Sequence, residues 1–257
     1  MLRPRIIPCL LIQGGGLVKT TGFASPKYVG DPINAIKIFN EKEADEIIVL
    51  DIDATVQKRN PNERLIAQFA AECRMPLCYG GGIRTPEQAK RIISLGVEKV
   101  SLSAAAFETP DIISEIASAI GSQSVVVVLD VRRTKSGSFM VFTHNGTKKT
   151  GIDLTRAARE AEQRGAGEIV VNSVDRDGLM AGYDLEAARI VREATRIPVT
   201  LLGGAGSLND INELVRICGI VGAAAGSLFV FKGAYRAVLI NYPTVEQRNK
   251  ISQLLNI

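Results

Sequence analysis

The stretch EIIVLDID at residues 46–53 returns later in the chain as EIVVNSVD at residues 168–175. The offset between the two copies is 168 − 46 = 122 residues. Each copy is a run of β-branched residues that ends near an aspartate, which is typical of a buried parallel strand. Two such runs far apart in one chain indicate an internal duplication.

The same offset recurs in features downstream of these strands. The matched pairs are Pro76 and Pro198, Gly81-Gly82 and Gly203-Gly204, Thr85 and Ser207, and, at 226 − 103 = 123, Ser103-Ala104 and Gly226-Ser227. Chance similarity between strands of one composition is the alternative, but it does not explain one offset shared by several unrelated motifs. We therefore predict two similar halves, at about residues 1–120 and 121–257.

Eight β-branched runs alternate with helical patterns along the chain, which is typical of a parallel sheet with crossover helices. The predicted strands cover residues 5–11, 46–52, 76–80, 99–103, 124–130, 168–174, 198–202 and 221–225. A length of 257 residues is ordinary for a (βα)8 barrel, and no linker interrupts the series. We expect an α/β protein whose residues 1–257 form one (βα)8 TIM barrel. A doubly wound open sheet is the alternative.

The composition excludes several classes of protein. Hydrophobic residues make up 46% of the chain, and no apolar run approaches the ~20 residues that would span a bilayer. The net charge of +4 comes without basic runs, which argues against nucleic-acid binding and suits a small phosphorylated ligand. The first residues lack a signal-peptide pattern, so we expect a cytoplasmic protein. The four cysteines lack metal-ligand spacing, so we expect reduced, mostly buried thiols and neither a metal nor a cofactor.

Glycines follow the third and seventh predicted strands, at 81–82 and 203–204. Glycine lets the backbone approach a ligand closely, and the helices that begin after Thr85 and Ser207 direct N–H groups toward an anion. Adjacent loops add Ser103 in the first half, and Gly226 and Ser227 in the second half. One glycine pair alone is usually a tight turn, but two related by the repeat predict two opposed phosphate sites. They imply one long substrate with a phosphate at each end.

Asp130 ends the run VVVVLD at the top of the fifth strand, where barrel enzymes keep catalytic groups. A salt bridge to Arg132 or Arg133 is the structural alternative. The repeat sets Leu11 against Asp130, at 130 − 11 = 119. A general acid and base pair needs two groups on opposite sides of a substrate, and leucine cannot transfer protons. Asp130 therefore lacks the expected partner.

Other rim residues allow two interpretations each. The carboxylates Asp51, Asp53, Asp175 and Asp177 could bind substrate hydroxyls or brace loops. Lys19, which follows the glycines at 14–16, could reach a phosphate from a mobile loop or could simply be exposed. His144, the single histidine, lies in the polar stretch THNGTKK and is expected to be solvated.

Four charged residues stand at the starts of predicted strands, before the apolar runs. They are Arg5, Glu46, Lys99 and Glu168. In one interpretation they are exposed strand-end charges. If they point inward, they form a ring of alternating sign across the barrel floor, with Glu98 beside it and available to a partner.

With these motifs the chain resembles HisF, the cyclase subunit of imidazole glycerol phosphate synthase, from end to end. The similar stretches are RIIPCL (5–10), GDP (30–32), LDI (50–52), GGGI (80–83), GSQSVVV (121–127), FMVFT (139–143), RGAGEI (164–169), DRDG (175–178) and GGAG (203–206). The resemblance implies a duplicated barrel that receives ammonia from a HisH-like glutaminase subunit on its floor, as a heterodimer. It also implies that ammonia joins a bisphosphorylated ribulosyl-formimino aminoimidazole, giving imidazole glycerol phosphate and aminoimidazole carboxamide ribotide.

The resemblance also implies residue roles. It places Arg5, Glu46, Lys99 and Glu168 in the family's ammonia gate, Gly82, Gly204 and Ser227 among the phosphate ligands, Asn172, Asp177 and Gly178 in the substrate site, and Asp130 as a catalytic aspartate. Three positions depart from the family pattern. Leu11 stands where the family has its second catalytic aspartate, Ser103-Ala104 replaces the usual Asn-Thr, and Asn172 replaces a usual threonine.

A second group of HisF-like proteins is similar through other stretches. These are IIPCLL (6–11), YVGDPINAIKIFNEKEADE (28–46), GSLFVF (226–231) and RAVLINYP (236–243). That resemblance implies a paralogue from a surface-polysaccharide or nonulosonic-acid gene cluster, which supplies ammonia for acetamidino groups on sugars together with a glutaminase and a separate amidotransferase. Three functions stay open: this sugar amidation, the histidine-pathway cyclase, and a noncatalytic scaffold. Leu11 separates the first two.

Overall fold

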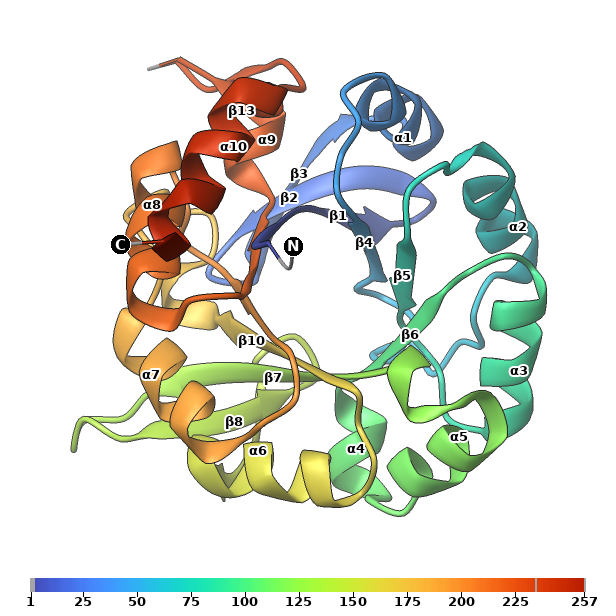
Figure 1. The fold of residues 1–257 in the computed structure, drawn as a ribbon. Helices are drawn as coiled ribbons and strands as arrows, with labels where there is room; N and C mark the ends of the chain where they lie inside the picture. Colours follow the sequence, from blue (N-terminus) through green and yellow to red (C-terminus); the bar gives the residue numbers. More distant parts are fainter. Residues whose placement is uncertain (1–2, 234, 257) are drawn as a thin grey trace.

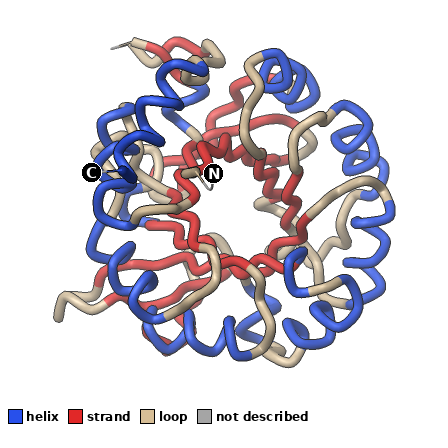
Figure 2. The backbone as a smooth tube through the Cα atoms, viewed as in Figure 1, coloured by secondary structure: helices blue, strands red, loops and turns tan. Residues whose placement is uncertain are grey.

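The computed structural model describes residues 3–233 and 235–256. In this part of the chain, eight parallel strands form a central barrel with helices around it (Figures 1 and 2). In chain order, the barrel strands are β1 (Arg5–Gln13), β4 (Ile47–Asp51), β5 (Leu77–Gly80), β6 (Lys99–Leu102), β7 (Val125–Arg133), β10 (Glu168–Ser173), β11 (Val199–Leu202) and β12 (Gly222–Ala225). All eight predicted strands are confirmed.

Two seams close the sheet. β1 pairs with β12 in parallel from Arg5↔Gly222 to Pro8↔Ala225, and β7 pairs with β10 over residues that include Asp130↔Asn172. Every barrel strand therefore has a neighbour on both sides, whereas an open doubly wound sheet would leave two free edges. The alternative of an open sheet is wrong, and the (βα)8 barrel is confirmed.

The strands are apolar on both faces because both faces are buried. Their outward side chains meet helices α1 (Pro32–Glu41), α2 (Glu63–Glu72), α3 (Pro86–Ser94), α4 (Ala104–Glu108), α5 (Ile112–Ile120), α6 (Leu154–Gln163), α7 (Leu185–Ala194) and α8 (Leu208–Cys218). Their inward side chains form a second, smaller core in the barrel lumen, which includes Ile7, Ile48, Val126 and Val170. This alternation explains why the strands read as continuous β-branched runs.

Two antiparallel hairpins extend the rim, after the first and the fifth barrel strands. β2 (Gly16–Thr21) and β3 (Ala24–Gly30) follow β1, and β8 (Phe139–Thr143) and β9 (Lys148–Asp153) follow β7. The first hairpin corrects the expectation of a mobile loop after the glycines at 14–16. Leu17 and Val18 are buried, and β2 pairs with a strand on each side, so this segment is an ordered part of the sheet.

The pairing of strands follows the repeat. Leu11 pairs with Leu50 in the first half, and Asp130 pairs with Asn172 in the second. Because 172 − 50 = 122 and 130 − 11 = 119, the strand register reproduces the two offsets of the sequence. Leu11 and Asp130 therefore occupy equivalent positions in the two halves.

The chain leaves the barrel after β12. It forms α9 (Ser227–Val230), a short hairpin of β13 (Phe231–Lys232) and β14 (Ala237–Val238), helix α10 (Val245–Gln253) and the 3-10 turn η3 (Leu254–Asn256). Figure 1 shows α10 beside α8, and the two helices are in contact. The part of the chain between β14 and α10 crosses to the barrel floor, where the Tyr242 hydroxyl donates to the carbonyl of Ile6.

The cysteines of this fold are free thiols, and Cys9, Cys78 and Cys218 are buried, as expected. Among the described residues, no group of three or more potential ligand side chains is arranged to hold a metal ion. No helix in the described ranges has the length and apolar character needed to cross a membrane.

Candidate functional site

A pocket opens at the carboxyl ends of the barrel strands, where the loops of both halves meet. The structure brings every predicted substrate-binding residue to its wall, together with Asp130. These residues are Lys19, Asp51, Gly81, Gly82, Ser103, Asn172, Asp177, Gly178, Gly204, Gly226 and Ser227. Leu11 also lines the pocket. One concave surface thus contains both predicted phosphate sites and Asp130, whose counterpart in the repeat is Leu11.

Asp130 is buried and is held by two neutral side chains. Asn172 donates its Nδ2 to Oδ1 at 2.9 Å, and the Ser103 hydroxyl donates to Oδ2 at 3.1 Å. Burial disfavours the charged carboxylate and outweighs these hydrogen bonds, so it raises the pKa of Asp130 to about 7. A carboxyl group with such a pKa can both give and take a proton near neutral pH.

The salt-bridge interpretation of Asp130 is wrong. Arg132 faces Asp175 at 4.0 Å, and Arg133 pairs with Asp184 and Glu186 on the outer side of the rim. Strand alternation turns Arg133 away from Asp130. Arg132, on the same face as Asp130, lies instead over the ring of Phe142 at 5.7 Å. Asp130 therefore faces the pocket without an arginine partner.

The predicted glycine sites have backbone conformations that only glycine adopts easily. Gly81, Gly82, Gly203 and Gly204 all have positive φ, between 76° and 121°. A Cβ on Gly82 would lie 2.6 Å from the carbonyl oxygen of Arg59, and one on Gly204 would lie 2.1 Å from that of Gly182. Side chains are thus excluded at both positions, and both glycines line the pocket.

The helices after these glycines begin as the sequence predicts. Thr85 caps α3 and Ser207 caps α8, each in a reciprocal capping box with the residue three positions later. Both helix N-termini follow the glycine loops and carry the partial positive charge that favours an anion. The two halves therefore present the same local structure at their phosphate sites.

Lys19 is more deeply placed than either interpretation of the sequence suggested. It lies on β2, is 5% exposed, and donates from Nζ to the carbonyl of Cys9 at 2.6 Å. Its Nζ is so close to Gly226 that a Cβ there would lie 2.2 Å away. Burial lowers the pKa of Lys19 below its ordinary value. The exposed-lysine alternative is wrong, and the amine reaches the second glycine site from an ordered strand.

The rim aspartates mainly brace loops. Asp51 accepts hydrogen bonds from the backbone of Asp53 and Ala54 and pairs with Arg59 at 3.2 Å. Asp177 accepts from the Thr20 hydroxyl at 2.6 Å and from a backbone N–H of the same hairpin.

Asp53 and Asp175 also make loop contacts, with Gln13 and with the Arg133 backbone. Gly178 follows with φ +71° and leaves room for the Thr20 carbonyl, since a Cβ would lie 2.2 Å from it. These contacts shape the rim around the pocket.

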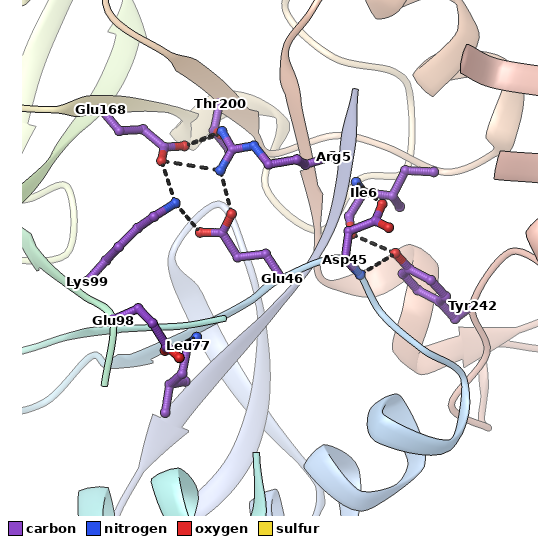
Figure 3. A network of polar contacts seen from close by, with 10 residues as sticks. All are labelled: Arg5, Ile6, Asp45, Glu46, Leu77, Glu98, Lys99, Glu168, Thr200 and Tyr242. Carbon is purple, nitrogen blue, oxygen red and sulfur yellow. Dashed lines mark hydrogen bonds and ion pairs between the residues drawn. The ribbon is translucent and has the colours of Figure 1, made fainter. Parts of the chain in front are cut away.

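The floor of the barrel holds the predicted charge ring, and all four side chains point inward (Figure 3). Arg5 pairs with Glu46 and, at 2.7 Å, with Glu168. Lys99 completes the ring at 2.7 Å from Glu46 and 2.9 Å from Glu168. The interpretation as exposed strand-end charges is wrong, because each cation is shared between two buried carboxylates.

The opposite charges of the ring stabilise one another against the cost of burial. Burial alone would disfavour charge on Glu168, but the hydrogen bond and charge of Arg5 hold the pKa of this carboxyl below its ordinary value. Burial likewise opposes the charge of Lys99, yet Glu168 and Glu46 together raise the pKa of Lys99. Arg5, Lys99 and Glu168 are therefore charged at neutral pH. Glu98 is exposed beside the ring, and its carboxylate accepts from the Leu77 N–H at 2.7 Å.

Comparison with known proteins agrees with this architecture. The family described as "Histidine biosynthesis protein" matches residues 5–236. A protein named "Putative imidazole glycerol phosphate synthase subunit HisF", from Leptospira interrogans, is 55% identical over 98% of this chain and 99% of its own length. The chain belongs to the HisF family. A "Putative imidazole glycerol phosphate synthase subunit hisF3" from Vibrio vulnificus is 56% identical over 99% of this chain and 98% of its own length.

The HisF relatives include proteins of lower similarity. "Imidazole glycerol phosphate synthase subunit HisF" from Lactococcus lactis is 44% identical, over 89% of each chain. The relatives whose names carry "Putative" thus match this chain over more of its length than the Lactococcus HisF does. This difference in extent agrees with two groups within the HisF family.

The sequence did not single out several site residues of this HisF homologue. Ser101 is buried in the lumen and its hydroxyl has no hydrogen-bond partner. Gly80 makes room for it, because a Cβ there would lie 2.0 Å from the Ser101 oxygen. Strand alternation could have identified both residues, since they point inward from adjacent strands β5 and β6.

A turn of the second hairpin reaches over the pocket. Asn145 donates from Nδ2 to the carbonyl of Ile52, on the loop after β4. His144 lines the pocket beside it and is only partly exposed, so the expectation of a solvated histidine is corrected. Its Nδ1 meets the Thr143 hydroxyl at 3.1 Å, and its Nε2 lies 3.7 Å from Glu108. The turn therefore covers part of the rim pocket of this HisF family member.

Proposed function

We propose that the chain is the synthase subunit of a glutamine-dependent complex. It receives ammonia from a HisH-like glutaminase docked on the barrel floor and delivers it to a phosphorylated small molecule in the rim pocket. The observation that carries this proposal is the closed ring of Arg5, Glu46, Lys99 and Glu168 across the floor.

A ring of this kind is costly as a purely structural device. Burying ions costs several kcal/mol each, and apolar side chains of similar volume often give equal or greater stability. The neighbouring layer of the lumen is in fact apolar, with Ile7, Ile48 and Val126. The ring therefore supports a functional role, and a small set of charges that can exchange partners is suited to opening and closing a narrow passage.

The lumen above the ring suits ammonia rather than ammonium. Its wall consists mainly of apolar side chains, which would leave a cation unsolvated but tolerate a small neutral molecule. The unpaired hydroxyl of Ser101 can exchange hydrogen bonds with ammonia on the way. At the upper end, the path reaches Asp130, which lines the rim pocket.

The rim supports binding of a substrate with two phosphates. The glycine sites at Gly82 and Gly204 lie in opposite halves of the barrel, and Ser227 and Lys19 add donors to the second site. Asp130, with its near-neutral pKa, is placed to transfer a proton to or from the reacting group. These residues support the phosphorylated substrate and the catalytic role of Asp130.

Leu11 directs the proposal toward an acceptor other than the histidine-pathway substrate. Cyclisation by a general acid and base needs a second proton-transferring group opposite Asp130, and the equivalent strand position holds leucine. We propose that the ammonia is used for amidation of a surface sugar, as an acetamidino group, with a separate amidotransferase. The second candidate is the cyclase subunit of imidazole glycerol phosphate synthase, which the names of the relatives and the paired glycine sites favour.

Docking of a glutaminase tests the central proposal. Mixing the chain with its cognate HisH-like subunit should give a stable heterodimer and raise the glutaminase rate, measured by size-exclusion chromatography and glutamate release. Lys99→Glu or Glu98→Lys should weaken docking or ammonia transfer at least about tenfold, the loss expected when a charged contact is reversed at an interface. Lys135→Glu, an equal change on an exposed turn at the opposite end, should have no effect. If no heterodimer forms, the scaffold interpretation replaces this one.

A further inference from the structure

The lower end of the seam between β1 and β4 lacks the hydrogen bonds that join these strands elsewhere. Their pairing runs from Cys9↔Ile48 to Ile12↔Asp51. Extending this register downward by three residues would place Ile6 opposite Asp45 (9 − 3 = 6, 48 − 3 = 45), but the ladder stops before that pair. Arg5 and Glu46, the neighbours of these two residues, carry one side of the charge ring.

Side chains bridge this gap in place of the ladder (Figure 3). The Tyr242 hydroxyl donates to the Ile6 carbonyl at 2.7 Å and accepts from the Asp45 N–H at 3.1 Å. The Asp45 carboxylate accepts from the Ile6 N–H at 2.9 Å. Both backbone groups of Ile6 are thus bound by side chains, the N–H by Asp45 and the carbonyl by Tyr242.

Tyr242 is itself firmly fixed. Its ring packs against Phe39 at 6.3 Å and Phe229 at 5.4 Å between centroids, and it is 9% exposed. Arg248, from α10, stacks over the ring at 5.3 Å and donates to the carbonyl of Lys42 at 3.2 Å. The aromatic ring and the arginine therefore anchor the segment before and within α10 against the strand starts.

We propose that Tyr242 is a positioning residue for the ammonia gate: its hydroxyl is a latch that joins Ile6 and Asp45, the chain neighbours of Arg5 and Glu46, and so keeps the charge ring closed. This deepens the proposed function and rests on the gate described there. When the hydrogen bonds of the Tyr242 hydroxyl break, the ends of β1 and β4 that no backbone hydrogen bond joins can separate. The Arg5–Glu46 ion pair then breaks, and the barrel floor opens on that side.

The comparisons support a role outside the general family core. The family match ends at residue 236, before Tyr242. The matches to the Leptospira and Vibrio relatives cover 98% and 99% of the chain, so they include this segment. Tyr242 therefore lies beyond the range of the family match, whereas its partners Ile6 and Asp45 lie within it.

Reaction of Cys78 with methyl methanethiosulfonate, a small neutral thiol reagent, tests the latch without a glutaminase or an acceptor. Cys78 is buried in the lumen beside Lys99, its partner in strand register, and does not line the rim pocket. Cys9 does line that pocket, and Cys218 lies in the outer core. Labelling of Cys78 therefore reports opening of the floor, and labelling of Cys9 reports access from the rim. Labelling of Cys218 reports general loosening of the fold.

Tyr242→Phe keeps the ring packing and removes only the hydroxyl. We expect Cys78 to react about five to ten times faster, the effect of losing roughly one net hydrogen bond, with Cys9 and Cys218 unchanged. Asp45→Ala should act in the same direction. Tyr183→Phe is the matched control, because Tyr183 is also buried and also donates to a strand carbonyl, that of Ala224, away from the seam.

Two results would overturn the latch: an unchanged Cys78 rate in Tyr242→Phe, or a parallel rise at Cys218, which would indicate general loosening. Peptide mass spectrometry after quenching measures all three rates. Faster Cys78 labelling together with a failed docking experiment would support the latch while removing the glutaminase. Successful docking together with an unchanged Cys78 rate would support the glutaminase partner and rule out the latch.

Discussion

Leu11 and Asp130 occupy the same position in the two halves, yet only Asp130 can transfer a proton. The hydrogen bonds of Asp130 come from Asn172 and Ser103, so the surroundings of a protonatable carboxyl are intact on its side of the pocket. On the other side, Leu11 packs against the apolar lumen cluster. At the scale of single residues, the site therefore keeps one half of an acid and base pair.

We expect the protein, supplied with ammonium, to turn over the ribulosyl-formimino substrate about 10² to 10⁴ times more slowly than a HisF with both aspartates. Leu11→Asp should recover measurable cyclisation, because Asp130 and the glycine sites are already in place. Leu50→Asp, at the strand position paired with Leu11, is a control that adds a carboxylate without restoring the repeat position. Wild-type turnover within tenfold of an ordinary HisF would refute the expectation.

The raised pKa of Asp130 predicts how stability depends on pH. The folded state keeps this proton up to about pH 7, whereas the unfolded chain releases it near pH 4, so the wild type should lose stability as pH rises between these values. Asp130→Asn, which cannot ionise, should lack this loss. Its free energy of unfolding relative to the wild type should rise by about 3 to 4 kcal/mol between pH 4 and pH 8. Urea titrations of both proteins across this range measure it, and a pH-independent difference would show that Asp130 titrates normally.

The sequence predicted the position of Asp130, but not its pKa or the burial of Lys19. Strand ends and repeat offsets can be recognised in the sequence alone, so the residues of the rim and of the charge ring could be predicted from it. The pKa of Asp130 depends first on its burial and then on side chains that follow β6 and lie on β10, and the burial of Lys19 depends on the hairpin to which it belongs. Tyr242 was missed because its role arises from a contact with Ile6 that no local motif encodes, whereas strand alternation could have identified Ser101.

The glycine loops show how one element is used twice with different neighbours. After β5, the glycines face Ser103, whose hydroxyl is occupied by Asp130. After β11, the corresponding glycines face Ser227 and the amine of Lys19. The second loop therefore has more free donors for an anion than the first.

Phosphate should accordingly raise the melting temperature of the wild type, and Gly204→Ala should abolish this rise because its Cβ meets the Gly182 carbonyl at 2.1 Å. Gly82→Ala, with a 2.6 Å contact at the weaker site, should reduce the rise only slightly. Gly137→Ala is the control, since its φ is +88° but no atom lies within 4 Å of the added carbon. Thermal unfolding with and without inorganic phosphate gives the shift in melting temperature for the wild type and for each variant. A full shift in Gly204→Ala would contradict a phosphate site at Gly204.

At the scale of the whole molecule, we propose residues 1–120 and 121–257 as the two duplicated units of one domain. Each unit contributes four of the barrel strands, and the pairings β1–β12 and β6–β7 join the units. Separating them would expose two strand edges on each unit, and unpaired edges promote association.

The fragment of residues 1–120 alone should therefore self-associate rather than form a stable monomer, as size-exclusion chromatography with light scattering would show. Co-expression with residues 121–257 should restore a species of the full-length mass, because the seam partners are then present. A monomeric 1–120 fragment with native-like circular dichroism would contradict the unit boundaries.

The charge ring is built unequally from the two units. Glu46 and Glu168 are related by the repeat (168 − 46 = 122), but Arg5 and Lys99 both come from the first unit, and their counterparts are Ser124 (5 + 119) and Gly222 (99 + 123). Two copies of the first unit would place four cations against two anions on the floor, and two copies of the second would place two anions with no cation. Either pairing would leave buried charge uncompensated. The four charges balance because one unit supplies both cations and each unit supplies one carboxylate, so the ring is a property of the joined units and of neither unit alone.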